Sequence, residues 1–106
     1  MGINVADPIL ARFRATLAAT YGARLDRIVL FGSRARGDAG QDSDYDVAIF
    51  LKALPDRWSE LDRLADLRVR FLDETGAFFD AKPFAAGAYD EESPLMGEIR
   101  REGVTL

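Results

Sequence analysis

The chain has 106 residues, 48% of them hydrophobic and 30% charged, which fits a single globular domain over residues 1–106. Its 14 basic residues are outnumbered by 18 acidic ones, and the net charge of −4 argues against a protein that holds nucleic-acid backbone. The absence of cysteine and histidine excludes disulfides, thiolate nucleophiles, imidazole bases and the usual zinc ligands, so any chemistry must use carboxylates, hydroxyls, Arg, Lys or a bound metal.

The first half of the chain predicts a helix followed by two strands. Asp7 and Pro8 are suited to begin a helix, because an aspartate can cap it and a proline fits its first position. Apolar residues then recur at helical spacing as far as Tyr21. The expected elements are a helix at 8–21, a strand at 27–31, a turn into a short helix at 32–37, a polar loop at 38–43 and a strand at 45–51.

The second half predicts a long amphipathic helix, a third strand and a short final helix. The long helix is capped by Asp56, runs to about Thr75 and stops at Gly76. Its expected inner side consists of Trp58, Leu61, Leu64, Ala65, Phe71 and Leu72. A strand at 77–84, a linker at 85–92 and a helix at 94–102 follow. The predicted fold is α/β (α+β), with a small mixed sheet packed against helices.

A glycine-serine turn directly follows the first predicted strand. Gly32 and Ser33 open the segment, and Arg34 and Arg36 add positive charge. A glycine turn into a helix start exposes backbone N–H groups toward a phosphate. The segment is neither a P-loop nor a dinucleotide fingerprint, because the glycine spacing of both motifs is absent. By itself, the turn is compatible with a phosphate site or with a simple chain reversal.

Acidic residues cluster where the second predicted strand begins. Asp42, Asp44 and Asp46 match the first ligand positions of an EF-hand, but Val47 and Ala53 replace its essential glycine and glutamate. A solvated acidic turn is one interpretation. On a strand, however, Asp44 and Asp46 point to the same face, with Cα atoms roughly 6.6 Å apart. Such carboxylates repel each other unless a cation lies between them, and oxygen ligands favour Mg²⁺ or Mn²⁺.

Asp80 is an isolated acid within the apolar third strand. A charge in that position needs a partner. Lys82, two residues further on the same face, offers a salt bridge, and a metal ion is the alternative. If the second and third strands are neighbours, Asp44, Asp46 and Asp80 converge beside the glycine-serine turn, an arrangement suited to two metal ions and a nucleoside triphosphate.

These motifs resemble the nucleotidyltransferase superfamily of DNA polymerase beta. The resemblance rests on Gly32-Ser33-x-x-Arg36-Gly37, on Ser43-Asp44-x-Asp46 and on the strand acid Asp80. More closely, the chain is similar to the minimal nucleotidyltransferases, which are small antitoxins encoded beside HEPN-type toxins. The closing segment 93–104 is similar to the end of those proteins, so the resemblance covers nearly the whole chain and implies the polymerase beta-like nucleotidyltransferase fold.

The resemblance implies that the chain transfers AMP from ATP to a tyrosine hydroxyl of a partner HEPN-type ribonuclease toxin, using two Mg²⁺ ions. Asp44 and Asp46 would bridge both ions, and Asp80 would hold the ion that activates the acceptor. Gly32 and Ser33 would bind the β- and γ-phosphates. Arg36 would support the site or contact a phosphate, and Arg34 is a weaker candidate for the same task.

Two other functions remain open at this stage. The chain could be a non-catalytic antitoxin that neutralises its toxin by binding, or a nucleotidyltransferase that modifies a small molecule such as an aminoglycoside. A complex with the toxin is expected if the chain transfers AMP to the toxin, and also if it neutralises the toxin by binding. No apolar run approaches the roughly 20 residues of a membrane helix, and no secretory signal is visible. We therefore expect a cytoplasmic protein with neither a membrane partner nor direct nucleic-acid binding.

Overall fold

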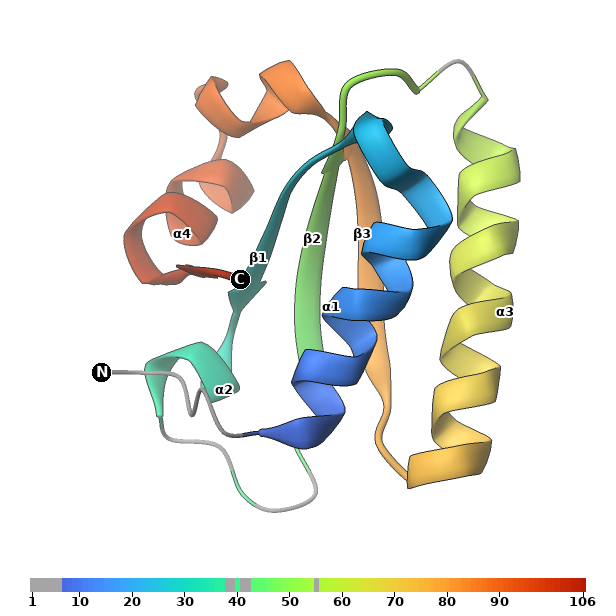
Figure 1. Cartoon of the computed structure of the whole chain (residues 1–106). Coiled ribbons are helices and arrows are strands. Elements are labelled where there is room, and N and C mark those ends of the chain that lie inside the picture. Colours follow the sequence, from blue (N-terminus) through green and yellow to red (C-terminus); the bar gives the residue numbers. More distant parts are fainter. Residues whose placement is uncertain (1–6, 38–39, 41–42, 55) are drawn as a thin grey trace.

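The computed structural model of the chain describes residues 7–37, 40, 43–54 and 56–106 (Figure 1). In chain order the elements are α1 (Pro8–Tyr21), η1 (Gly22–Arg24), β1 (Leu25–Phe31), α2 (Ser33–Arg36), β2 (Tyr45–Leu51), α3 (Arg57–Thr75), β3 (Phe79–Ala85), η2 (Ala86–Asp90), α4 (Pro94–Glu102) and β4 (Val104–Thr105). None of the helices in these ranges combines the length and apolar character needed to cross a bilayer.

Side-chain caps begin the three longer helices, and Asp7 and Asp56 are the caps that the sequence predicts. The Asp7 carboxylate accepts hydrogen bonds from the first backbone N–H groups of α1. Asp56 does the same for α3, and the Ser93 hydroxyl does so for α4. At the other end of α3, Gly76 adopts a left-handed conformation with φ of 77°. Local chemistry therefore fixes where these helices begin and end.

The four strands form a mixed sheet in the order β3-β2-β1-β4. β1 is antiparallel to both β2 and β4, whereas β2 and β3 are parallel. The parallel pair is joined by the long crossover helix α3, as such a pair requires. This arrangement confirms the predicted fold class of a small mixed sheet packed against helices.

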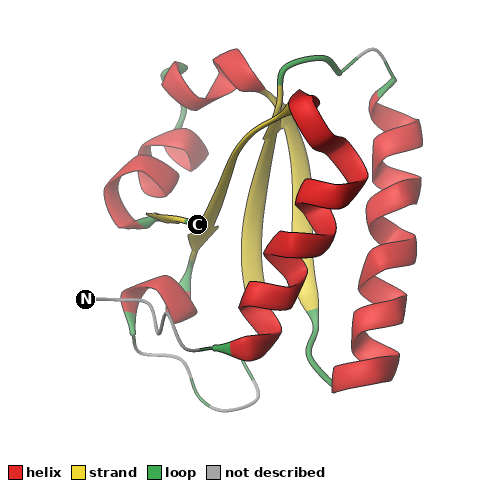
Figure 2. Cartoon of the chain, in the orientation of Figure 1, coloured by secondary structure: helices red, strands yellow, loops and turns green. Residues whose placement is uncertain are grey.

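Helices cover both faces of the sheet (Figure 2). α1 and α3 pack on one face around Phe13, Phe71 and Phe79. α4 and η2 cover the other face, where Met96 and Ile99 meet the sheet. Because side chains alternate along a strand, every second residue of β2 and β3 points toward the α4 side.

The structure corrects several sequence-based details. Trp58 and Leu72 are not on the inner side of α3, because they are 78% and 46% exposed. The buried side is instead formed by Glu60, Leu64, Leu67 and Phe71. The third strand occupies Phe79–Ala85 rather than 77–84, and β4 was not predicted. Most of the predicted loop at 38–43 lies outside the described residues.

Phe79 is the central side chain of the core beneath the sheet. It is fully buried, and it stacks on Phe13 with ring centroids 3.9 Å apart and on Tyr45 with centroids 4.5 Å apart. Its neighbour Phe78 is 38% exposed.

We predict that Phe79→Ala lowers the free energy of unfolding by about 3–5 kcal/mol. The matched Phe78→Ala substitution should lower it by less than about 1.5 kcal/mol. Urea denaturation of both variants measures the difference, and equal losses would contradict this description of the core.

Candidate active site

Strand pairing places Asp46 and Asp80 side by side. In the register of the sheet, Asp46 on β2 lies opposite Phe31 on β1 and beside Asp80 on β3. Neighbouring strands are about 4.8 Å apart, and paired residues of parallel strands point to the same face. The two carboxylates therefore share the face of the sheet that carries α4. The strand adjacency that the sequence analysis left conditional is thus present.

Gly32 brings the glycine-serine turn against the Asp46 carboxylate. This glycine has φ of 74°, a conformation that other residues rarely adopt. A Cβ atom at this position would lie 2.3 Å from Oδ2 of Asp46. The missing side chain therefore serves two purposes, since it permits the sharp turn after β1 and leaves room for the carboxylate. Ser33, the first residue of α2, follows directly and is half-buried.

The electrostatic environment raises the pKa of Asp46 above its ordinary value. Partial burial is the largest cause, and the negative charge of Asp80 is the second. Asp44 and Glu98 add to the effect, whereas Lys82 opposes it. The protein alone thus leaves an excess of negative charge at Asp46. Glu98, which α4 brings near this carboxylate, was missed by the sequence analysis because nothing in its local pattern connects it to β2.

The other two predicted acids have different surroundings. Asp44 lies just before β2 and is exposed. Asp80 accepts a hydrogen bond from Nζ of Lys82 at 3.2 Å, which is the salt bridge that the sequence analysis held open as an alternative. Within the described ranges, no three acidic side chains form a group suited to hold a metal ion. The structure brings Asp46 and Asp80 together and leaves Asp44 at the entrance of the strand.

The donor set is nonetheless compatible with a hard divalent cation. Asp44, Asp46 and Asp80 offer only carboxylate oxygens, which are the ligands that Mg²⁺ prefers. Burial and, after it, the negative charge of Asp80 raise the pKa of Asp46, and a bound cation would offset that charge. Of the three acids, the structure brings Asp46 and Asp80 into neighbouring positions where they could share a cation, and Asp44 lies at the start of the strand.

The two arginines of α2 connect the turn to its surroundings. Nη1 of Arg36 lies 3.1 Å from Oε1 of Glu102, so this pair ties α2 to the end of α4. That contact agrees with the structural role considered for Arg36. Arg34 donates from Nε to the Ser43 carbonyl at 2.9 Å, and its guanidinium group lies 3.9 Å from the centre of the Tyr45 ring. Tyr45 is the unspecified position between Asp44 and Asp46 in the motif, so the motif gave no sign of this contact.

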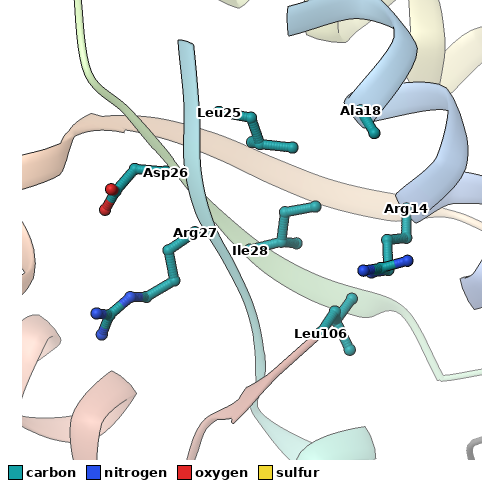
Figure 3. Close-up of a pocket in the computed structure, with 7 residues that line it drawn as sticks. All are labelled: Arg14, Ala18, Leu25, Asp26, Arg27, Ile28 and Leu106. Atoms are coloured by element: carbon teal, nitrogen blue, oxygen red, sulfur yellow. The ribbon is translucent and has the colours of Figure 1, made fainter. Parts of the chain in front are cut away.

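A cavity of about 180 Å³ lies away from these residues, between α1 and the first half of β1 (Figure 3). Arg14, Ile28 and Leu106 are among its lining residues, and Arg27 and Asp26 extend from β1 beside it. None of its lining residues belongs to the predicted site. The cavity is therefore separate from the carboxylates.

Residues 10–96 match the family model described as a nucleotidyltransferase domain. The chain belongs to the nucleotidyltransferase domain family. This membership confirms the family that the motifs indicated. The match includes the glycine-serine turn and all three predicted carboxylates, which lie within the matched residues.

Individual proteins similar to this nucleotidyltransferase domain agree with the family assignment. Over 47 residues the chain is 43% identical to "Putative protein adenylyltransferase MJ0141" of Methanocaldococcus jannaschii. That alignment covers 44% of this chain and 48% of the relative, so it spans about half the length of the curated protein.

Two solved structures share the fold. The crystal structure of a toxin-antitoxin with AMP-PNP has a TM-score of 0.61 and 20% identity, over 89% of this chain and 69% of that chain. A variant of the toxin-antitoxin MntA-HpeT has a TM-score of 0.62 and 20% identity, over 91% of this chain and 70% of that chain. At this level of identity, the likeness establishes the fold of the nucleotidyltransferase domain.

The contact between Gly32 and Asp46 predicts a specific cost of adding one methyl group. Gly32→Ala should lower the free energy of unfolding by more than about 2 kcal/mol, since it combines a disfavoured backbone conformation with a clash. Gly37→Ala is the control for a positive φ without a clash, because Gly37 is in the left-handed region (φ 83°, ψ 10°) and nothing lies within 4 Å of an added Cβ. Gly32 (φ 74°, ψ −156°) lies in a region that essentially only glycine adopts. Gly37→Ala should lose only about 1 kcal/mol.

Chemical denaturation compares the two glycine variants. In an Asp46→Ala background, the loss caused by Gly32→Ala should shrink, because the clashing carboxylate is gone, and should stay above that of Gly37→Ala, because the backbone conformation of Gly32 still disfavours a Cβ. A loss that is unchanged in this background would contradict the contact.

The raised pKa of Asp46 predicts how its amide variant responds to pH. A carboxyl whose pKa is higher in the folded state favours folding below its unfolded pKa, and this contribution is lost as pH rises through the folded pKa. In metal-free buffer, Asp46→Asn should therefore raise the melting temperature at neutral pH and lose that advantage well below the ordinary pKa of 3.8.

Thermal unfolding at pH 7 and at pH 3, with chelator present, measures this prediction. Asp62→Asn on the exposed face of α3 is a control that removes the same charge and should change the melting temperature little. A lower melting temperature for Asp46→Asn at neutral pH would contradict the electrostatic description.

Proposed function

We propose that the chain transfers AMP from ATP to a tyrosine hydroxyl of a partner HEPN-type toxin, and thereby acts as an antitoxin. Membership of the nucleotidyltransferase domain family supports the class of reaction. The name of the relative from Methanocaldococcus jannaschii supports a protein acceptor, and the toxin-antitoxin structures that share the fold support a toxin as that acceptor. The complex of one of them with AMP-PNP supports an adenine nucleotide as the donor.

One observation carries the proposal, namely that Asp46 and Asp80 are paired in register beside Gly32. Two like charges at adjacent sheet positions repel each other, and Lys82 compensates only part of that charge. The turn that can receive a phosphate is in direct contact with the same carboxylate. A triphosphate and its metal ions would therefore meet at this position, which is the requirement for nucleotidyl transfer.

In the proposed reaction, the acceptor oxygen forms a bond to the α-phosphorus of ATP, and the bond from that phosphorus to the bridging oxygen of the β-phosphate breaks. Pyrophosphate leaves, and the hydroxyl proton passes to a carboxylate, with Asp80 as the candidate. Asp44, Asp46 and Asp80 would hold two Mg²⁺ ions. When bound, such ions neutralise the charge that develops on the entering and leaving oxygens.

The rest of the proposed site would bind the nucleotide and position the acceptor hydroxyl. The backbone of Gly32 and the hydroxyl of Ser33 would contact the terminal phosphates. The Asp80 side chain is 35% exposed on an edge strand, so a hydroxyl on another protein could reach it. Positioning and charge neutralisation suffice for this class of reaction, and the lack of histidine is therefore no obstacle.

A labelling experiment tests the proposal. The chain is incubated with Mg²⁺, α-labelled ATP and the HEPN-type toxin proposed as its partner, and the label on the toxin is mapped by mass spectrometry. Wild type should label a tyrosine. Asp44→Ala/Asp46→Ala and Asp80→Asn should each reduce the initial rate by at least about 10²-fold. The matched control Asp62→Ala/Asp66→Ala, which removes two exposed charges from α3, should retain the wild-type rate.

Other outcomes would replace the proposal. Full neutralisation of the toxin by Asp44→Ala/Asp46→Ala, with no label transferred by wild type, would indicate an antitoxin that acts by binding. Label that appears on an added aminoglycoside and never on the toxin would indicate a small-molecule transferase. A normal rate for Asp80→Asn would show that the third carboxylate is assigned wrongly.

A further inference from the structure

We propose that Arg34 and Tyr45 are positioning residues that hold the Gly32–Ser33 turn and the strand carboxylates in one fixed arrangement. This inference rests on the proposed function. Tyr45 separates Asp44 from Asp46 in the sequence, whereas Arg34 follows Ser33. Contact between these two side chains therefore links the proposed phosphate-binding turn to the carboxylates of the site.

Arg34 makes two different contacts with the segment that leads into β2. Its Nε donates to the Ser43 carbonyl at 2.9 Å, and its guanidinium group lies 3.9 Å from the centre of the Tyr45 ring. A planar guanidinium can stack on a ring while it donates in its own plane, which an ammonium group cannot do. Arginine at this position therefore fixes both the distance and the orientation of α2 relative to the start of β2.

Tyr45 is itself fixed from two further directions. Its hydroxyl donates to Oδ2 of Asp7 at 2.6 Å, while Oδ1 of the same carboxylate caps α1. The side chain is 4% exposed. The ring therefore has little freedom to move with Arg34.

The Tyr45 ring also packs against β3, the strand that carries Asp80. It stacks on Phe79 with centroids 4.5 Å apart and an interplanar angle of 12°. The next residues along the two strands are Asp46 and Asp80, which are partners in the register. Because adjacent side chains point to opposite faces, the ring stack lies beneath the sheet where the carboxylates lie above it.

Loss of the contact between Arg34 and Tyr45 should lower the rate of transfer more than the affinity for the nucleotide. Phosphate contacts made by the turn persist if α2 shifts slightly against β2, whereas the alignment of the α-phosphorus with the carboxylates does not. A displacement of about 1 Å can reduce the rate of a positioned reaction by 10²-fold. We therefore expect substitutions of this pair to lower kcat and to leave nucleotide binding nearly unchanged.

The test is a double-variant cycle with a matched control pair. Arg34→Lys keeps the charge but loses the planar contact, and Tyr45→Leu removes the ring. The control is Arg27 with Tyr89, where the guanidinium lies 3.8 Å from the ring centre and outside the site. Arg27→Lys and Tyr89→Leu repeat the chemical changes. For all variants, kcat and KM of transfer, the Kd for AMP-PNP and the urea midpoint are measured.

We expect Arg34→Lys and Tyr45→Leu each to lower kcat by about 10²-fold, with the Kd for AMP-PNP within twofold of wild type. The double variant should lose little more than the larger single loss, because each change breaks the same link. Tyr45→Phe, which keeps the ring, should restore most of kcat although it loses the bond to Asp7. The control variants should retain kcat even where their urea midpoints fall.

Several results would overturn the inference. A large increase in the Kd for AMP-PNP with Arg34→Lys, together with multiplicative losses in the double variant, would make Arg34 a phosphate ligand instead. Equal kcat losses in the control pair would indicate general destabilisation. In both cases an active wild type leaves the proposed function intact, whereas a wild type that transfers nothing overturns the function and this inference together.

Discussion

The repulsion between the carboxylates of Asp46 and Asp80 is the constraint on which the account of this nucleotidyltransferase domain depends. The two residues are register partners on parallel strands, and the negative charge of Asp80 contributes to the raised pKa of Asp46. An amide at position 46 would avoid the repulsion, so the charge of Asp46 is a cost to folding. Lys82 compensates part of the charge from the Asp80 side, and Glu98 adds to it from α4. Such an arrangement is typical of a site whose charge is balanced by a ligand.

The rest of the fold holds this unfavourable pair in place. The crossover helix α3 allows β2 and β3 to run parallel, which aligns Asp46 with Asp80. Beneath the sheet, Phe79 packs between the rings of Phe13 and Tyr45, so the strands cannot slip without losing that stack. Above it, the pair of Arg36 with Glu102 joins the short helix α2 to α4. The apolar core and the ion pair thus oppose the local repulsion from both faces of the sheet.

The sequence predicted the elements well where local chemistry determines them. The bounds of β2 follow from one apolar run, and those of α3 follow from Asp56 and Gly76. It predicted the inner side of α3 less well, because Trp58 and Leu72 are apolar yet belong to a different face from the buried residues. A two-residue strand such as β4 is too short to leave a pattern.

In the site, the residue types and spacing indicated the three acids, whereas the pairing of Asp46 with Asp80 depends on the topology. The links made by Tyr45 and the proximity of Glu98 arise only from tertiary packing and could not be predicted from local sequence.

The most direct test of the central claim is to ask whether a divalent cation binds at Asp46 and Asp80. Titration of the ¹⁵N-labelled chain with substoichiometric Mn²⁺, in the presence of AMP-PNP, locates the ion through broadening of nearby amide signals. The account predicts selective broadening around Gly32, Asp46 and Asp80, with the amides of Asp62 and Asp66 on α3 unaffected and with the effect abolished by Asp46→Asn. Broadening centred on α3, or broadening that survives Asp46→Asn unchanged, would contradict it.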